Sequence, residues 1–192
     1  MEKFLFAGLG NFDPEYAGTR HNIGFDVVDA FAGRHGGNFI VRRLAGVTEL
    51  KWKGRTVFCI KPTTYMNLSG KAVKYWVEKE NIRLENLMVI VDEISLPLSK
   101  LRIRPGGSAG GHNGLKSVQE YLGTTEYPKL RFGTGNHFPR GNQVEYVLGK
   151  WKPEETALVS LKIERSLDAL ESFIQIGIER TMEQFNKLEL TL

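Results

Sequence analysis

The side chains that could do chemistry lie after expected strands and inside glycine-rich segments. His21 shortly precedes an expected helix and Asp92 directly follows an apolar run, so the two could meet across a cleft. A histidine held by a carboxylate is suited to act as a general base toward water. Side-chain amides nearby could stabilise the oxyanion formed when a carbonyl group is attacked. The candidates are Asn11, His21, Asn67, Asp92, His112 and Asn113. Taken singly, the same residues also fit roles as helix caps, turn residues or surface side chains.

Two glycine-rich segments fail the tests for nucleotide binding. Residues 8–13 begin like the dinucleotide motif G-x-G-x-x-G, but Asp13 occupies the third glycine position. A carboxylate there would repel a pyrophosphate. Residues 106–113 have the glycine spacing of a phosphate-binding loop, but His112 stands where the lysine is needed. We therefore expect neither a dinucleotide site nor nucleotide hydrolysis.

A serine esterase and a metal site are also poorly supported. Residues 106–110 match the nucleophile motif G-x-S-x-G, in which Ser108 would be the nucleophile. That fold orders its triad as serine, acid, histidine, whereas both histidines after Ser108 precede the only later aspartate, Asp168. A triad completed by Glu126 and His137 stays open, with no other feature in its favour. The histidines and the single cysteine show no metal-ligand spacing, so we expect no metal and no cofactor.

The elements that must position these residues alternate between strands and helices. Apolar or alternating runs predict strands at residues 4–9, 39–44, 48–52, 56–60, 87–91, 100–104 and 130–133. Apolar residues at helical spacing predict helices at 23–31, 69–81 and 115–122, and one long helix from 153 to 185. Asn22 and Ser69 are expected to cap the first two helices, and Lys53-Gly54 is expected to form a hairpin turn.

This alternation predicts an α/β fold, a three-layer α/β/α sandwich around a central mixed, twisted sheet. The sheet should be mixed because the middle strands are connected by a hairpin. We find no internal repeat, low-complexity tract or linker. Residues 1–192 are therefore expected to form a single domain.

Composition points to a folded protein of the cytoplasm. Hydrophobic residues make up 41% and charged residues 25%, values that exclude disorder and a fibrous repeat. Cys59 is the only cysteine, so no disulfide can form within the chain. No signal peptide is evident, and no apolar stretch is long enough to cross a membrane. We expect a cytoplasmic location without membrane contact.

The charge distribution suggests a polyanionic partner. The net charge is +4, but residues 97–152 carry nine basic residues against three acidic ones. A basic segment within a nearly neutral chain favours nucleic acid as the partner. A solvated basic face without a partner would have the same composition.

Five motif blocks occur in order between residues 4 and 150, and together they resemble the bacterial peptidyl-tRNA hydrolase family. The blocks are GLGN at 8–11, EY at 15–16 with TRHNIG at 19–24, KPTTYMNLSG at 61–70, GGSAGGHNGLK at 106–116 and VEYVLG at 144–149. The resemblance implies hydrolysis of the ester between a peptide and the 3′-terminal ribose of tRNA. That reaction recycles tRNA from peptidyl-tRNA dropped by stalled ribosomes. It also implies a monomer that uses no metal.

The resemblance assigns roles to individual residues. It places the catalytic base at His21 and its supporting carboxylate at Asp92. The asparagine that recognises the peptide falls on Asn11, and the basic pair that grips acceptor-stem phosphates falls on Arg104 and Arg131. Positions that line the cleft for the tRNA end and the peptide fall on Tyr16, Tyr65, Asn67, His112 and Asn113.

The chain departs from the family pattern in its loops. Phe12-Asp13 replaces a usual Pro-Gly, Ser95 replaces a common aspartate and Ser99 a frequent glycine. These changes affect the expected loop geometry but not the expected reaction. The alternative is a non-catalytic RNA-binding protein, as in relatives of plant organelles that have lost hydrolysis. The intact pair of His21 and Asp92 argues against it.

Overall fold

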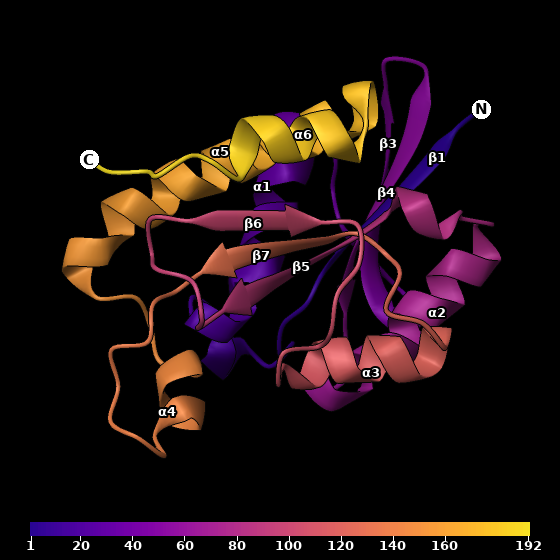
Figure 1. Cartoon of the computed structure of the whole chain (residues 1–192). Helices are drawn as coiled ribbons and strands as arrows, with labels where there is room; N and C mark the ends of the chain where they lie inside the picture. The colour runs from indigo at the N-terminus through magenta and orange to yellow at the C-terminus, as the bar shows by residue number, and fades with distance from the viewer.

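A mixed sheet of seven strands forms the centre of the computed structural model, which describes residues 1–192 (Figure 1). The strand order is β2-β3-β4-β1-β5-β7-β6. All seven strands fall on segments predicted from the sequence. They are β1 Lys3–Gly8, β2 Ile40–Arg42, β3 Ala45–Trp52, β4 Arg55–Pro62, β5 Leu87–Glu93, β6 Leu101–Arg104 and β7 Lys129–Gly133.

The strand directions bring four strand ends to one edge of the sheet. Strands β4, β1, β5 and β7 pair in parallel, whereas β2, β3 and β6 join antiparallel to their neighbours. Strand β1 lies between β4 and β5, the strands that come later in the chain. In such sheets ligands bind beyond the carboxyl ends of the strands, where the connections diverge.

Helices cover both faces of the sheet, which confirms the predicted three layers (Figure 1). Each layer buries its own apolar cluster against the sheet. Helices α1 Ile23–Arg34, α5 Thr156–Ile176 and α6 Ile178–Phe185 lie on one face, and α2 Ser69–Lys79 and α3 Asn113–Leu122 on the other. A short helix, α4 Gln143–Val147, lies apart at the edge of the molecule, with loops on either side (Figure 1).

Two local predictions about turns and caps had different outcomes. The hairpin turn between β3 and β4 is confirmed, because Lys53 and Gly54 both have left-handed φ angles, 48° and 78°. The prediction that Ser69 caps the next helix is wrong. Ser69 is already the first residue of α2, and its hydroxyl donates to the Met66 carbonyl at 2.7 Å instead of accepting from the helix.

The prediction of one long C-terminal helix is also wrong. Gly177, with φ of +86°, separates α5 from α6. The apolar stripe nevertheless continues across the break, because Phe173, Ile174 and Phe185 all belong to the same buried cluster. The helical period of the apolar residues therefore predicted the buried face of both helices correctly. It did not predict the break at Gly177, because many helices tolerate a single glycine.

Close backbone contacts between α1 and the sheet depend on two glycines. A Cβ atom at Gly8 would lie 2.1 Å from the Gly24 carbonyl oxygen, and one at Gly24 would lie 2.5 Å from the Ile90 carbonyl oxygen. No larger residue fits at either position without moving the helix. The two glycines thus let the start of α1 lie directly against β1 and β5, and this brings His21, in the turn before α1, to Asp92 near the end of β5.

The buried lysine on α5 gives a first testable prediction. The Lys162 ammonium donates to the Gly133 carbonyl at 2.7 Å and lies 3.9 Å from the centre of the Phe132 ring. Burial lowers the pKa of Lys162 from 10.5 to about 7. Because the folded pKa is lowered, the unfolded chain binds more protons between these two values, and stability should rise with pH there.

We expect the Lys162→Met variant to lack this rise. Urea unfolding of both proteins at pH 7 and pH 9.5 should show the wild type gaining on the order of 2 kcal/mol relative to the variant. Equal pH dependence of the two unfolding free energies would contradict the lowered pKa.

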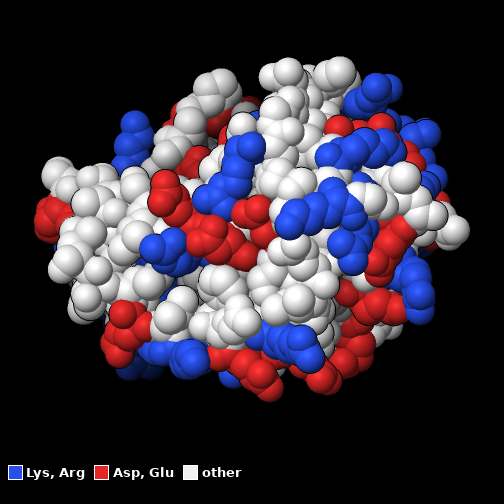
Figure 2. All heavy atoms as spheres, turned by 90° about the horizontal axis from the view of Figure 1, so that it is seen from above, with Lys and Arg blue, Asp and Glu red and all other residues white.

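Charges of both signs share the face that carries α5 and α6. Figure 2 shows basic and acidic side chains interleaved across it, with no continuous basic area. A mixed face gives no extended field to attract a polyanion.

Candidate active site

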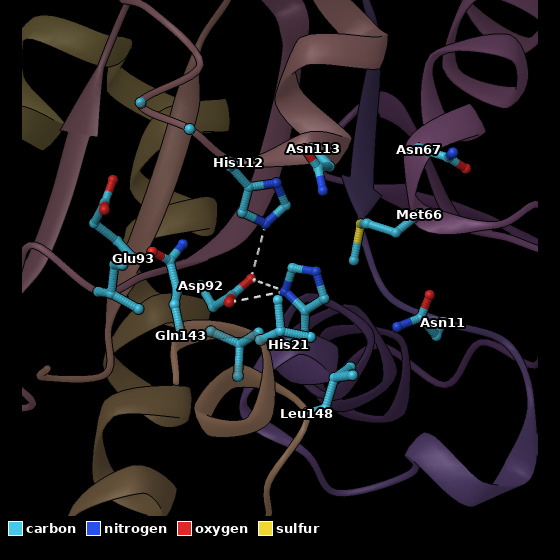
Figure 3. A pocket seen from close by; sticks show the side chains of 15 residues that line it. Asn11, His21, Met66, Asn67, Asp92, Glu93, His112, Asn113, Gln143 and Leu148 are labelled. Carbon is cyan, nitrogen blue, oxygen red and sulfur yellow. Dashed lines mark hydrogen bonds and ion pairs between the residues drawn. The ribbon is translucent and has the colours of Figure 1, made fainter. Parts of the chain in front are cut away.

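The candidate residues converge on a cavity of about 300 Å³ beyond the carboxyl ends of β1 and β5 (Figure 3). His21 lies in the 3-10 turn Arg20–Asn22 that leads into α1, Asp92 lies near the end of β5, and His112 precedes α3. The cavity brings together all six residues proposed from their types: Asn11, His21, Asn67, Asp92, His112 and Asn113.

His21 is held by Asp92 through one ring nitrogen. Its Nδ1 atom lies 3.0 Å and 2.9 Å from the two carboxylate oxygens of Asp92. A carboxylate accepts, so Nδ1 carries a proton, and in the neutral tautomer of the ring Nε2 has the free lone pair. Figure 3 shows Asn11, Asn67 and Asn113 on the other side of the ring from Asp92. The arrangement is that of a base directed into a polar cavity.

His112 bonds the same carboxylate, and its ring centre lies 4.9 Å from that of His21. Its Nδ1 atom accepts from the backbone N–H groups of Gly114 and Leu115 at 3.1 Å and 3.3 Å. The ring proton must therefore be on Nε2, which donates to Asp92 Oδ1 at 2.9 Å. His112 thus caps α3 and orients Asp92 with a single tautomer.

Asp92 is a buried carboxylate that stays ionised. Burial by itself raises the pKa of its carboxyl group, but His112 and His21 outweigh burial and hold that pKa well below its ordinary value. At neutral pH the group therefore accepts hydrogen bonds from both rings and donates none.

Asn22 occupies the N-cap position of α1 as expected from the sequence, but its side chain holds the backbone of Asn11 instead of capping the helix. Its side chain makes no bond to α1. Instead, Asn22 Oδ1 accepts from the Asn11 N–H at 2.8 Å, and Nδ2 donates to the Asn11 carbonyl at 2.9 Å. Asn22 is buried, so this pair of bonds is shielded from water. It fixes the Asn11 backbone beside His21.

The sequence did not predict the wall formed by the short helix α4. Gln143, Val144, Val147 and Leu148 line the cavity from this side. The helix is only five residues long, and the family motif at 144–149 was the sole signal for it. Other lining residues that were missed lie inside or beside predicted motifs: Met66, Glu93, Ile94, Gly110 and Gly111.

Two tyrosines assigned to the cleft do not line this cavity. Tyr65 is 65% exposed, and its ring centre lies 6.4 Å from that of Phe12. Phe12 is one of the departures from the family pattern, so the loop change places a second exposed aromatic ring beside Tyr65. Tyr16 is half-buried, and its carbonyl accepts from the Thr19 hydroxyl at 2.8 Å.

A second hollow of about 400 Å³ adjoins the first and has no hydrophobic lining residue. Arg102 and Arg104 of β6 and Arg131 of β7 line it. Glu93 and Gly110 line both hollows, so the arginines stand directly beside the cavity of His21.

The two arginines assigned to phosphate contacts have different surroundings. Arg104 is exposed, and its guanidinium donates only to the neighbouring Ile103 carbonyl at 3.0 Å. Arg131 is buried, pairs with Glu93 at 2.9 Å and donates to the Ser108 carbonyl. Arg104 is thus free to meet an anion, whereas Arg131 already ties β7 to the glycine-rich loop. Ser95, another departure from the family, donates its N–H to Glu93 at 3.2 Å.

His21, Asp92 and His112 are also the residues that could hold a cation. They offer ligand atoms that all lie within 4.8 Å of one another. The same atoms form the hydrogen bonds described above, so a metal would have to displace both ring protons from Asp92. The donor set is therefore already used by the protein itself.

Comparisons with known proteins agree with one another. The peptidyl-tRNA hydrolase family model matches residues 5–191. The chain is 50% identical to the peptidyl-tRNA hydrolase of Parabacteroides distasonis, over 96% of this chain and 98% of that protein. It is 42% identical to that of Halalkalibacterium halodurans, over 95% of this chain and 99% of that one.

A solved structure extends this similarity to three dimensions. The peptidyl-tRNA hydrolase of Acinetobacter baumannii aligns with a TM-score of 0.92 at 30% identity, covering 97% of this chain and 95% of that one. None of the helices combines the length and the apolar character that crossing a membrane requires.

Proposed function

The chain belongs to the peptidyl-tRNA hydrolase family, whose activity is hydrolysis of the ester bond of peptidyl-tRNA. From that premise we propose that His21 is the general base of the reaction. The observation that carries the proposal is the bond from His21 Nδ1 to Asp92, because in the neutral ring it leaves Nε2 as the nitrogen that can accept a proton in the cavity. A nitrogen in this state can accept a proton from water without the help of a metal.

The reaction then proceeds in two proton transfers. His21 Nε2 takes a proton from water as the water oxygen bonds to the ester carbonyl carbon. The tetrahedral intermediate collapses with cleavage of the bond to the ribose oxygen, which takes the proton back from His21. The products are a free peptide carboxyl group and a tRNA with an intact 3′-terminal hydroxyl. Asp92 stabilises the imidazolium that exists between the two transfers.

Side-chain amides in the cavity supply the remaining contacts. Asn67 and Asn113 can donate to the oxygen that gains charge in the intermediate. Asn11, whose backbone is held by Asn22, is assigned to the peptide. Since peptidyl-tRNA and aminoacyl-tRNA differ at the amino group of the esterified residue, an amide there lets the enzyme select the peptide.

The substrate's acceptor stem is assigned to the arginine-lined hollow. Phosphate contacts carry no sequence information, which suits an enzyme that must accept many tRNAs. Arg104 is expected to supply the larger share, because Arg131 is already paired with Glu93. We assign the enzyme to recycling of tRNA from peptidyl-tRNA released by stalled ribosomes, acting as a cytoplasmic monomer.

Replacing Arg104 should change the salt dependence of tRNA binding. We expect Arg104→Ala to lower the slope of log K against log salt by about one unit, because one phosphate contact is lost. Fluorescence titration of tRNA at several salt concentrations measures this slope. Arg83→Ala is the matched control, since Arg83 is exposed near the opposite end of β5 and pairs only with Glu85. Equal slopes for the two variants would contradict the assignment.

Release of N-acetyl-amino acid from N-acetyl-aminoacyl-tRNA tests the proposed mechanism. We expect turnover in the presence of EDTA, with free aminoacyl-tRNA left intact. Loss of turnover in EDTA that is restored by added metal would overturn the metal-free base. Tight tRNA binding without turnover would favour an RNA-binding role.

A further inference from the structure

The residue before His21 joins the catalytic segment to the far wall of the cavity. Arg20 is only 4% exposed, although it carries a charge. Its Nη1 atom donates to the Tyr146 carbonyl at 3.1 Å, and Nη2 pairs with Glu155 at 3.2 Å. The guanidinium lies 4.1 Å from the centre of the Tyr146 ring and 5.4 Å from that of Trp151. One side chain thus contacts the short helix α4 and the segment that follows it.

The backbone reinforces this junction. The Arg20 N–H donates to the Gly149 carbonyl at 3.0 Å, and Thr19 forms an antiparallel bridge with Lys150. A Cβ atom at Gly149 would lie 3.1 Å from Arg20 Nη1. A side chain at Gly149 would therefore press on the guanidinium, and the segment after α4 runs directly against the turn that carries His21.

Helix α4 depends on such contacts for its position. Five residues are too few for a helix to be stable alone in water. Tyr146 is its one buried residue, and the tyrosine hydroxyl donates to the Thr134 carbonyl at 2.7 Å. The Arg20 guanidinium packs against the ring of the same tyrosine and donates a hydrogen bond to its carbonyl. Val147, the next residue, faces the cavity.

We propose that Arg20 is a positioning residue that sets the α4 wall at a fixed distance from His21. The substrate cavity then has two walls, the base on one side and α4 on the other, that are joined through Arg20. Loss of the Arg20 contacts with Tyr146 and Glu155 should weaken the contact of Val147 with the substrate, while Asp92 still holds His21. The inference rests on the proposed function, because it takes this cavity as the substrate site.

The test is a double-mutant cycle in the hydrolysis assay. Arg20→Lys keeps the charge but cannot bond Tyr146 and Glu155 with one planar group. We expect KM to rise about tenfold with a smaller change in kcat, a loss equal to that of one hydrogen bond from a charged group. Val147→Ala should also raise KM, but by a smaller factor in the Arg20→Lys background than in the wild type.

A matched variant separates this role from a general effect on folding. Arg34 lies at the other end of α1 and pairs with Asp168 and Glu171 of α5, away from the cavity. Arg34→Lys should lower the melting temperature without changing KM. If Arg20→Lys keeps KM within twofold, or if its effect adds independently to that of Val147→Ala, Arg20 has only a structural role.

Two further variants test the proposal if Arg20→Lys does not fold, and they separate it from the proposed role of His21. Gly149→Val leaves Arg20 in place but forces a branched side chain against its guanidinium, since a Cβ atom there already lies 3.1 Å from Nη1. It should raise KM even if Arg20→Lys fails to fold, and an unchanged KM would overturn the proposal. His21→Ala in the same assay separates the two hypotheses. If His21→Ala is inactive and Arg20→Lys has an unchanged KM, only the positioning role of Arg20 is refuted. If His21→Ala is active, the proposed general base is refuted.

Discussion

Replacement of His21 by alanine is expected to lower kcat for peptidyl-tRNA hydrolysis by about a thousandfold, while the affinity for tRNA stays within about threefold. The reason is that His21 is the histidine of the cavity whose Nε2 makes no bond to the protein, while its Nδ1 is held by Asp92. His112, the other ring nearby, uses Nδ1 to cap α3 and Nε2 to bind Asp92, so it cannot take over. The measurement is single-turnover release of N-acetyl-amino acid, combined with a tRNA binding titration.

Ser108→Ala is the control for this experiment. The glycine-rich loop matches a serine-nucleophile motif, but the contact that Ser108 makes with Arg131 uses its carbonyl oxygen, which alanine also has. Hydrolysis by this variant should therefore remain close to that of the wild type. If Ser108→Ala were the inactive variant and His21→Ala the active one, the ester would be attacked by serine and not by water.

The sequence predicted the sheet and the main catalytic candidates because both leave local signals. Apolar or alternating runs marked all seven strands, while the end of an apolar run marked Asp92 and the position before an expected helix marked His21. The predicted meeting of these two residues also needed the glycine contacts between α1 and the sheet. A glycine in a sequence does not tell which backbone approaches it, so only the structure gives that reason.

The features that the sequence did not predict depend on contacts between distant segments. Asn22 has the residue type and position of a helix cap, and only the fold shows that Asn11 competes for its side chain. Arg131 has the charge of a phosphate ligand, but Glu93 lies 38 positions away and pairs with it. Helix α4 is too short to show a helical period in the sequence. Its position in the cavity wall depends on the hydrogen bonds that Tyr146 makes with Arg20 and Thr134. The single-domain arrangement, the monomeric state and the residue roles stay predictions.

Substitution of Asp92 by asparagine should be nearly as damaging as loss of the base itself, although the side chain keeps its shape. His112 can present only Nε2–H to this position, because its Nδ1 is occupied by the N–H groups of Gly114 and Leu115. The single amide oxygen of the asparagine must therefore face His112. Its NH₂ group is then left facing His21 and needs an acceptor there.

The NH₂ group would lie at the Oδ2 position, 2.9 Å from His21 Nδ1, where two N–H groups repel each other. A shift of the His21 proton from Nδ1 to Nε2 removes this repulsion, but Nε2 is the atom that has to accept a proton from water. We therefore expect Asp92→Asn to lower kcat by about 10³- to 10⁴-fold with KM changed by less than about threefold, as for other bases forced into the wrong tautomer. Steady-state kinetics give both values, and the ¹⁵N shifts of the His21 ring give the tautomer directly. Glu93→Gln is the comparison, because the neighbouring carboxylate pairs with Arg131 and not with His21, and its effect on kcat should be far smaller. A loss of less than tenfold in Asp92→Asn, or an Nδ1-protonated His21 in that variant, would mean that the carboxylate does not set the state of the base.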